Sequence, residues 1–251
     1  MDEPMFNAVW DWFRWLNDAY GINLTIFYDP FDRQRFLYGV VTTVLLSVVC
    51  IVISIVVGVI GAWLQMSRKI FVRTLVQAYV QFFRNTPSLI QLYFFYFAVD
   101  TALSHLLGLR HLFGSFGWAV LALSLFAGAF NVELFRSGIE AVPKTMIEAA
   151  ESLGYSRLGV YRYVILPLAL RICLPALNNN LVNLVKTTTL AYAISVPETL
   201  WVSSQIWGDQ LNTVEMMNVV LAVYLLVVGV LVFAMNRWER ALQIPGFGDR
   251  Q

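Results

Sequence analysis

The sequence has few charged residues for its length. Charged side chains make up 13% of the 251 residues and apolar residues 59%, against about 25% and roughly 45–50% in soluble proteins. The net charge is only +1 and no basic run is present, which argues against nucleic acid as a partner. The composition therefore excludes an ordinary soluble domain.

Cysteine, histidine and phosphate-binding glycine motifs are scarce or absent. The two cysteines, Cys50 and Cys173, lie in apolar stretches, so neither a disulfide framework nor a zinc site is expected. The two histidines, His105 and His111, fall in a loop between apolar segments, which leaves no membrane-embedded catalytic or metal site apparent. None of the 15 glycines is followed by lysine, so there is no Walker A loop. We therefore predict a chain that is no enzyme and binds no cofactor itself.

Long charge-free segments are what the sequence does contain. Three of them reach the length of about 20 residues that a membrane-spanning helix needs, namely those between Arg35 and Arg68, between Arg110 and Glu133, and between Glu215 and Arg237. The expected spans are residues 36–66, 74–99, 112–132, 164–192 and 216–236, with a short helix or re-entrant piece at 195–207. Gly58 and Gly61 give the first span a face that a neighbouring helix can approach closely. The predicted fold is all-α, with about five transmembrane helices.

A proline interrupts the second predicted span. The charge-free run after Pro87 stops at Asp100 and is too short to cross a membrane alone, so the piece before the proline must contribute. Thr86 as the cap and Pro87 at the first helical position predict a half-helix whose free N–H groups point into the membrane. Such broken helices can hold a substrate carboxylate at mid-membrane.

Polar residues near this break are candidates for a substrate pathway. Arg84 is a bidentate carboxylate donor and Gln91 lies one turn beyond the proline. The alternative is that Arg84 reaches the interface or pairs with Glu133. Glu133 in turn can bind a substrate ammonium or pair with Arg136 three residues on, and the pairing is favoured. Asn131 has no expected role beyond polar lining.

The fourth span carries a polar stripe. Asn179, Asn183 and Lys186 share one helical face. Thr187 lies four residues after Asn183 and therefore belongs to the same stripe. Because a buried basic residue is costly in a membrane, this stripe is expected to have a partner or a function. Two interpretations remain open: a hydrogen-bonded seam between two subunits, and lining of the pathway.

The charge distribution orients the chain. With the N-terminus outside, eleven Lys and Arg residues fall on the inner side and four on the outer side, as the positive-inside rule requires. The expected organisation is an outer-face segment at 1–35, a transmembrane domain at 36–246 and a cytoplasmic tail at 247–251. The aromatic residues of the first segment suggest an amphipathic helix on the outer leaflet.

The inner loop at about 143–167 has the pattern of an ordered, apolar docking element. Thr145 and Glu148 have the spacing of a capping box, alanines favour a helix, and Gly154 is suited to a left-handed helix end. Its candidate coupling residues are Glu148, Ala149, Ala150, Leu153, Gly154, Leu158 and Pro167. Such a loop is expected to sit in a groove of another protein.

This loop resembles the coupling loop of permease subunits of ATP-binding-cassette importers. The pattern Glu-Ala-Ala, Gly and Ile-x-Leu-Pro is matched at 148–150, 154 and 164–167, with Val164 where isoleucine is usual. Residues 82–92, 133–139 and 183–190 resemble the polar amino acid branch of that family. The similarity extends over about 37–246, and the segment 1–35 is longer than expected for the branch.

The resemblance implies a type I importer permease and its assembly. A second permease subunit, identical or a sister chain, would complete the pathway in a bacterial inner membrane. Two cytoplasmic ATPase subunits would bind ATP and Mg, and a periplasmic amino-acid-binding protein would deliver a polar amino acid. The segment 1–35 could contact this binding protein instead of the outer leaflet. The alternative is a secondary transporter driven by an ion gradient, although no convincing internal repeat is found.

Overall fold

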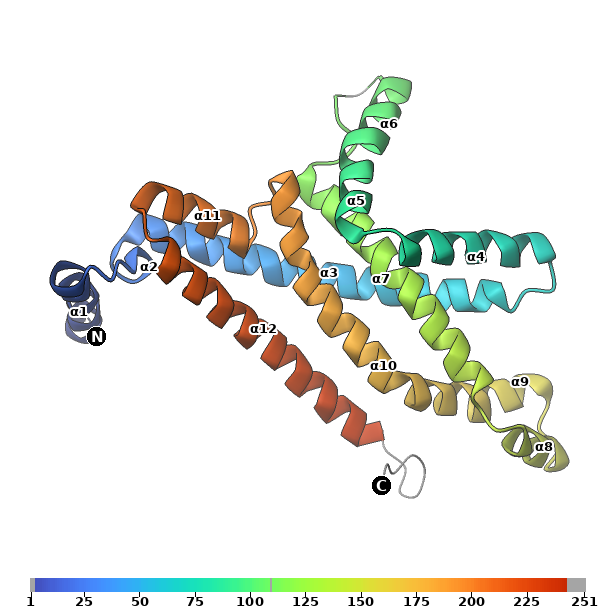
Figure 1. Cartoon of the computed structure of the whole chain (residues 1–251). Helices are drawn as coiled ribbons and strands as arrows, with labels where there is room; N and C mark the ends of the chain where they lie inside the picture. Colours follow the sequence, from blue (N-terminus) through green and yellow to red (C-terminus); the bar gives the residue numbers. More distant parts are fainter. Residues whose placement is uncertain (1–2, 109, 243–251) are drawn as a thin grey trace.

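The computed structural model describes residues 3–108 and 110–242, and all regular structure within them is helical (Figure 1). The expected tail at 247–251 lies outside the described residues. In chain order the elements are α1 (Glu3–Tyr20), α2 (Thr25–Tyr28), α3 (Pro30–Gln65), α4 (Ile70–Asn85), α5 (Ser88–Tyr93), η1 (Phe94–Val99), α6 (Asp100–Leu107), α7 (Ser115–Glu140), α8 (Lys144–Ser152), α9 (Arg157–Val160), η2 (Tyr161–Ile165), α10 (Leu166–Thr187), η3 (Thr188–Ile194), α11 (Thr199–Gln210) and α12 (Thr213–Leu242).

Five helices in the described parts of the chain are long and apolar enough to cross a membrane, which confirms the predicted number. They are Pro30–Gln65, Ser88–Leu107, Ser115–Glu140, Arg157–Ile194 and Thr213–Ala241. The predicted short helix between the last two is α11. The second span, Ser88–Leu107, lies wholly after Pro87, so the expectation that the piece before the proline contributes to it was wrong. Other boundaries were also wrong, since α3 begins before residue 36 and α7 continues past residue 132. The reason is that charged residues mark the edge of the apolar run, whereas the helical backbone continues beyond it.

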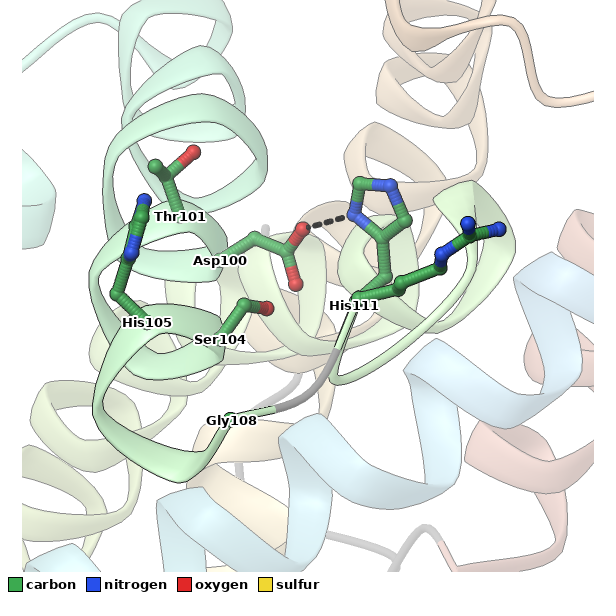
Figure 2. A pocket seen from close by; sticks show the side chains of 7 residues that line it. Asp100, Thr101, Ser104, His105, Gly108 and His111 are labelled. Atoms are coloured by element: carbon green, nitrogen blue, oxygen red, sulfur yellow. Dashed lines mark hydrogen bonds and ion pairs between the residues drawn. The ribbon is translucent and has the colours of Figure 1, made fainter.

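The second spanning helix continues past Asp100, where the charge-free run was expected to stop. The carboxylate of Asp100 is buried and accepts hydrogen bonds from His111 Nδ1 (2.7 Å), the Leu112 backbone N–H (3.0 Å) and Trp118 Nε1 (2.9 Å). Figure 2 shows the Asp100 and His111 side chains pointing toward each other across the turn that follows α6. Because these donors replace water, the acid is accommodated inside the helical segment Ser88–Leu107.

The centre of the molecule is the crossing of α3 and α7, which have the most extensive contact of any two elements. A Cβ atom on Gly58 would overlap the Cβ of Asn131, and one on Gly61 would overlap Val132 Cγ2. The close approach expected from these glycines is therefore confirmed. Figure 1 shows α10 and α12 beside this pair, with α8 and α9 at one end of the bundle and α1 at the other.

Candidate functional site

The break in the second predicted span is present where the sequence placed it. α4 ends at Asn85 and α5 begins at Ser88. Gln91 is buried, and its Nε2 donates to the carbonyl oxygens of Phe83 (2.9 Å) and Thr86 (3.0 Å) across the break. Gln91 thus supports the broken backbone from within.

The predicted cap of this half-helix was wrong. The hydroxyl of Thr86 donates backward to the Phe82 carbonyl oxygen (2.7 Å), and Pro87 is the N-cap residue of α5. A threonine hydroxyl can bond to the carbonyl four residues earlier as easily as it can cap the next helix. Thr86 therefore completes the last turn of α4.

α4 separates apolar and polar side chains onto two faces. Val76, Val80 and Phe83 are buried, and Val76 and Val80 pack in one cluster with Val132 of α7. The opposite face is exposed and polar, and it carries Arg73, Gln77, Gln81, Arg84 and Asn85. These residues recur at the spacing of one helical face. The sequence analysis identified only Arg84 among them, although their period of about 3.6 residues was the available signal.

This polar face borders a pocket of about 430 Å³ between α3, α4 and α7. Its lining residues are Gln65, Arg73, Gln77, Gln81, Glu133, Arg136 and Glu140. The pocket holds two basic and two acidic side chains within a helical bundle. A solute that carries both charges could find partners of both signs in it.

The charges of the pocket are connected to each other. Arg136 Nη2 bonds to Glu133 Oε2 (2.8 Å), and Arg136 Nη1 reaches both carboxylate oxygens of Glu140 (2.7 Å each). Gln65 Nε2 donates to Glu133 Oε1 (3.4 Å). The favoured interpretation, in which Glu133 pairs with Arg136, is confirmed.

Arg84 lies against α7 near the same acid. Its guanidinium stands 5.4 Å from the centroid of the Phe130 ring, one helical turn before Glu133. The Arg84 side chain is exposed. The end of α4 therefore places an exposed base against α7, one turn from the half-exposed Glu133.

Asn131 and the polar residues of α10 are divided between the interior and the exposed surface. Asn131 is fully buried, donates to Ser54 Oγ (3.3 Å) and accepts from Asn180 Nδ2 (2.8 Å). It links α3, α7 and α10, so the expectation of a lining role at this position was wrong. Asn179, Asn183 and Lys186 are exposed on the other side of α10, with Thr187 half-buried beside them.

The candidate coupling loop folds as two short helices joined at Gly154. Gly154 has φ +85°, the Tyr155 N–H donates to the Ala150 carbonyl oxygen (3.2 Å), and the Gly154 N–H donates to the Glu151 carbonyl oxygen (2.9 Å). This is the hydrogen-bond pattern of a glycine-terminated helix, as predicted. Leu153 and Leu158 are 79% and 76% exposed at the tip.

Other expectations for this loop need correction. Thr145 caps nothing, because α8 already begins at Lys144 with Pro143 as its N-cap residue. Ala150, one of the candidate coupling residues, is buried within the loop, whereas Glu148 and Ala149 are exposed. Pro167 is half-buried in the first turn of α10.

A second pocket, of about 410 Å³, lies at the opposite end of the molecule beside α6 (Figure 2). His105 projects from α6 on one side of it, and His111 lies on the other side, bonded to Asp100. Within residues 3–108 and 110–242, no group of three or more His, Cys, Asp or Glu side chains could hold a metal ion. The arrangement supports the turn after α6.

A helical bundle with five spans, a charged pocket between α3, α4 and α7, and a projecting loop with exposed leucines defines a multi-pass membrane permease. The chain belongs to the family described as binding-protein-dependent transport system inner membrane component, which matches residues 54–242.

Relatives of known function are similar over most of the chain. The nopaline transport system permease protein NocM of Agrobacterium fabrum (strain C58 / ATCC 33970) is 33% identical, with 77% of this chain and 81% of NocM covered. The histidine/lysine/arginine/ornithine transport system permease protein HisM of Salmonella typhimurium is 34% identical, with 83% and 90% covered. These relatives support an importer permease over an ion-driven transporter.

Solved structures agree with this assignment. A chain of an amino acid ABC transporter crystallised with histidines superposes with a TM-score of 0.74 at 26% identity, over 83% of this chain and 94% of that chain. An inward-facing MetNI methionine ABC transporter gives a TM-score of 0.66 at 22% identity, over 86% and 99%, and supports the fold alone.

Proposed function

We propose that this chain is the permease subunit of an ATP-driven importer for a polar amino acid. The named relatives are permease proteins of a nopaline transport system and of a histidine/lysine/arginine/ornithine transport system. The substrate would be delivered by a periplasmic binding protein and released into the cytoplasm by alternating access. ATP and Mg would be bound by the partner ATPase, since this sequence has no Walker A loop.

The observation that carries the proposal is the position of Arg84 at the helix break, against Phe130 of α7, one helical turn before Glu133 in the charged pocket. Arg84 at the end of α4 is the proposed contact for the substrate α-carboxylate, and Glu133 is the proposed contact for the ammonium. A zwitterion needs both, and a charged partner at each end compensates its loss of hydration. Gln91 acts indirectly by supporting the break.

Two exposed surfaces support the proposed partners. Leu153 and Leu158 at the tip of the coupling loop would insert into a groove of the ATPase. Asn179, Asn183 and Lys186 project from a membrane-spanning helix, where uncovered polar side chains are costly in lipid. A second permease subunit, identical or a sister chain, would cover them.

The proposed orientation places the N-terminus outside and the C-terminus in the cytoplasm of a bacterial inner membrane. α8 and α9 lie at the same end of the bundle as the C-terminal end of α12 (Figure 1). The charge count of the sequence, eleven basic residues assigned to the inner side against four to the outer side, supports this orientation.

The test is uptake of radiolabelled amino acids by the complete complex in proteoliposomes that contain ATP. Loss of one charge-assisted hydrogen bond, about 1.5–3 kcal/mol, should reduce uptake by Arg84→Ala roughly ten- to a hundredfold. Arg84→Lys should retain part of it, and Arg110→Ala, in the turn after α6 and away from the helix break, should behave as wild type. Assembly with the ATPase should be unchanged in all three variants.

Two outcomes would contradict the proposal. Normal uptake by an assembled Arg84→Ala complex would remove the carboxylate contact. Uptake driven by a proton or sodium gradient, without ATP and the ATPase, would instead support a secondary transporter.

A further inference from the structure

The N-terminal helix α1 lies outside the family match, which begins at residue 54. From Val9 onward its described side chains divide into three faces. One face is apolar and exposed and includes Trp12 and Trp15, which are 53% and 51% exposed. A second face is polar, with Asp11 and Arg14 exposed and joined by an ion pair of 3.9 Å.

The third face packs on the outer end of the spanning bundle. The ring of Phe13 stacks on Phe27 with 4.3 Å between centroids, and the guanidinium of Arg33 lies 4.6 Å from the centroid of the Trp10 ring. The polar face of α1 is thus suited to water and the packed face contacts the bundle. The exposed face with Trp12 and Trp15 needs surroundings that accept indole rings.

The position of α1 is fixed by the connector to α3. Gly21, with φ +70°, turns the chain after α1. Asn23 then bonds to both helices that flank the α11–α12 turn and to the turn itself. Its backbone N–H donates to Glu215 Oε1 of α12 (3.3 Å), its Nδ2 donates to the Gln210 carbonyl oxygen of α11 (3.4 Å), and its carbonyl accepts from Asn212 Nδ2 (2.8 Å). These bonds join the connector that follows α1 to the bundle.

The depth of α1 matches the edge of the lipid. Arg33, which contacts α1, precedes the charge-free run that starts at Phe36 by three residues, about 4.5 Å along a helix. Interfacial helices bury their apolar face about 5–10 Å into the headgroup and acyl boundary. Figure 1 shows α1 beside the first residues of α3 and turned across the line of that helix.

The chemistry of the exposed face favours lipid over a protein partner. Tryptophan and tyrosine are the residues that concentrate at membrane interfaces, and Trp12, Trp15 and Tyr20 are all exposed here. Exposed apolar side chains continue from there into the spanning part of α3, through Phe31, Leu37, Tyr38 and Val41. The acidic residues Asp11 and Asp18 lie on the polar side, where they remain in water.

We propose that α1 lies in the headgroup region of the outer leaflet, with its Trp12 and Trp15 face on zwitterionic lipid. In this position it anchors the outer ends of α3, α11 and α12 at a fixed depth. The partner is the lipid surface itself, and the binding protein is excluded from this face.

The test places a fluorophore on each side of α1 in the full complex, reconstituted into phosphatidylcholine nanodiscs. Cys50 and Cys173 are replaced by alanine, and single cysteines are introduced as W12C and W15C. The matched controls are D11C and D18C, on the polar face of the same helix. Quenching is measured with a nitroxide on the lipid headgroup and with iodide in the water.

The expected result is that the lipid nitroxide quenches W12C and W15C several-fold more strongly than D11C and D18C, and that iodide shows the reverse order. Equal quenching of all four positions by iodide would show that α1 stands in water. Protection of W12C only after addition of the loaded binding protein would assign the face to that protein instead. Either result would overturn the proposal, and neither depends on which solute is transported.

Discussion

At the scale of single residues, the close approach of Gly58 on α3 to Asn131 on α7 leaves no room for a side chain. A Cβ atom on Gly58 would overlap the Cβ of Asn131 and lie 3.1 Å from its carbonyl carbon, so backbone would have to move. Gly58→Ala should therefore reduce the free energy of unfolding by about 1–3 kcal/mol, the usual cost of overpacking. The measurement is thermal unfolding of the purified complex in detergent.

A matched control is available in α12. Gly229 lies in a helix interior, and no atom lies within 4 Å of the position that a Cβ on it would take. Gly229→Ala should be neutral or should stabilise the protein by about 0.4–1 kcal/mol, because alanine restricts the unfolded chain. Equal melting temperatures for the two variants would show that the crossing has room for a methyl group at Gly58.

Glu198 is the second residue with a testable consequence. It is fully buried, it accepts backbone N–H bonds from Leu200 (2.9 Å) and Trp201 (2.8 Å), and it receives the Tyr224 hydroxyl (2.9 Å). Burial raises the pKa of Glu198 above its ordinary value of 4.5, and the three hydrogen bonds oppose this only in part. Folding therefore favours the protonated carboxyl of Glu198 more than water does.

The sign of the pH effect follows from this raised pKa. The contribution of Glu198 to stability is fully present below pH 4.5, where the unfolded carboxyl is protonated, and is lost as the pH rises through the folded pKa. The melting temperature of wild type minus that of Glu198→Gln should therefore increase as the pH falls from neutral toward 4.5. A difference that does not change with pH would contradict the assignment.

Individual contacts were the least predictable level from sequence. The pairing of Glu133 with Arg136 could be inferred, since both lie on one helix and their spacing decides it. The burial of Asn131 could not, because its partners Ser54 and Asn180 come from two other helices. The hydroxyl of Thr86 could donate to the carbonyl of Phe82 or cap the helix that follows. Sequence alone does not decide between these two hydrogen bonds.

At the scale of elements, the coupling loop has the clearest prediction. Leu153→Asp combined with Leu158→Asp should abolish co-purification of the ATPase, because a carboxylate would be buried without a partner in an apolar groove. Leu211→Asp is the control, an equally exposed leucine at the other end of the molecule (89% exposed). The measurement is recovery of the ATPase with the tagged permease.

Retention of the ATPase by the double variant would contradict the docking role of this tip. A loss caused equally by Leu211→Asp would point to general misfolding instead.

Element identity was largely predictable from the sequence. In lipid only helices satisfy their own backbone in a single segment, so apolar length alone gives three spans, and the interrupted apolar runs at 74–99 and 164–192 give the other two. Pro87 and Gly154 act through their own backbone, so both helix ends were found. The polar face of α4 was not predicted because Arg73 was assigned to the inner loop. The helical spacing of the polar residues from Arg73 to Arg84 was therefore overlooked.

At the scale of the whole molecule, orientation can be measured directly. With Cys50 and Cys173 replaced by alanine, Asp18→Cys should react with a membrane-impermeant maleimide in intact spheroplasts. Ser152→Cys, exposed in the coupling loop, should react only after lysis. The reverse labelling pattern would show that the charge asymmetry had been misread.

The close crossing of α3 and α7 has a consequence for how the whole molecule moves. Glycines on one helix accept side chains of the other, and the buried Ser54–Asn131 bond joins the two at the same level. Sliding either helix by a fraction of a turn would drive backbone into side chain, so the two must travel as one rigid body through the transport cycle. Rearrangement then falls on the turns at 66–69 and 86–87, which are therefore where spectroscopic distance labels should record the largest angular change.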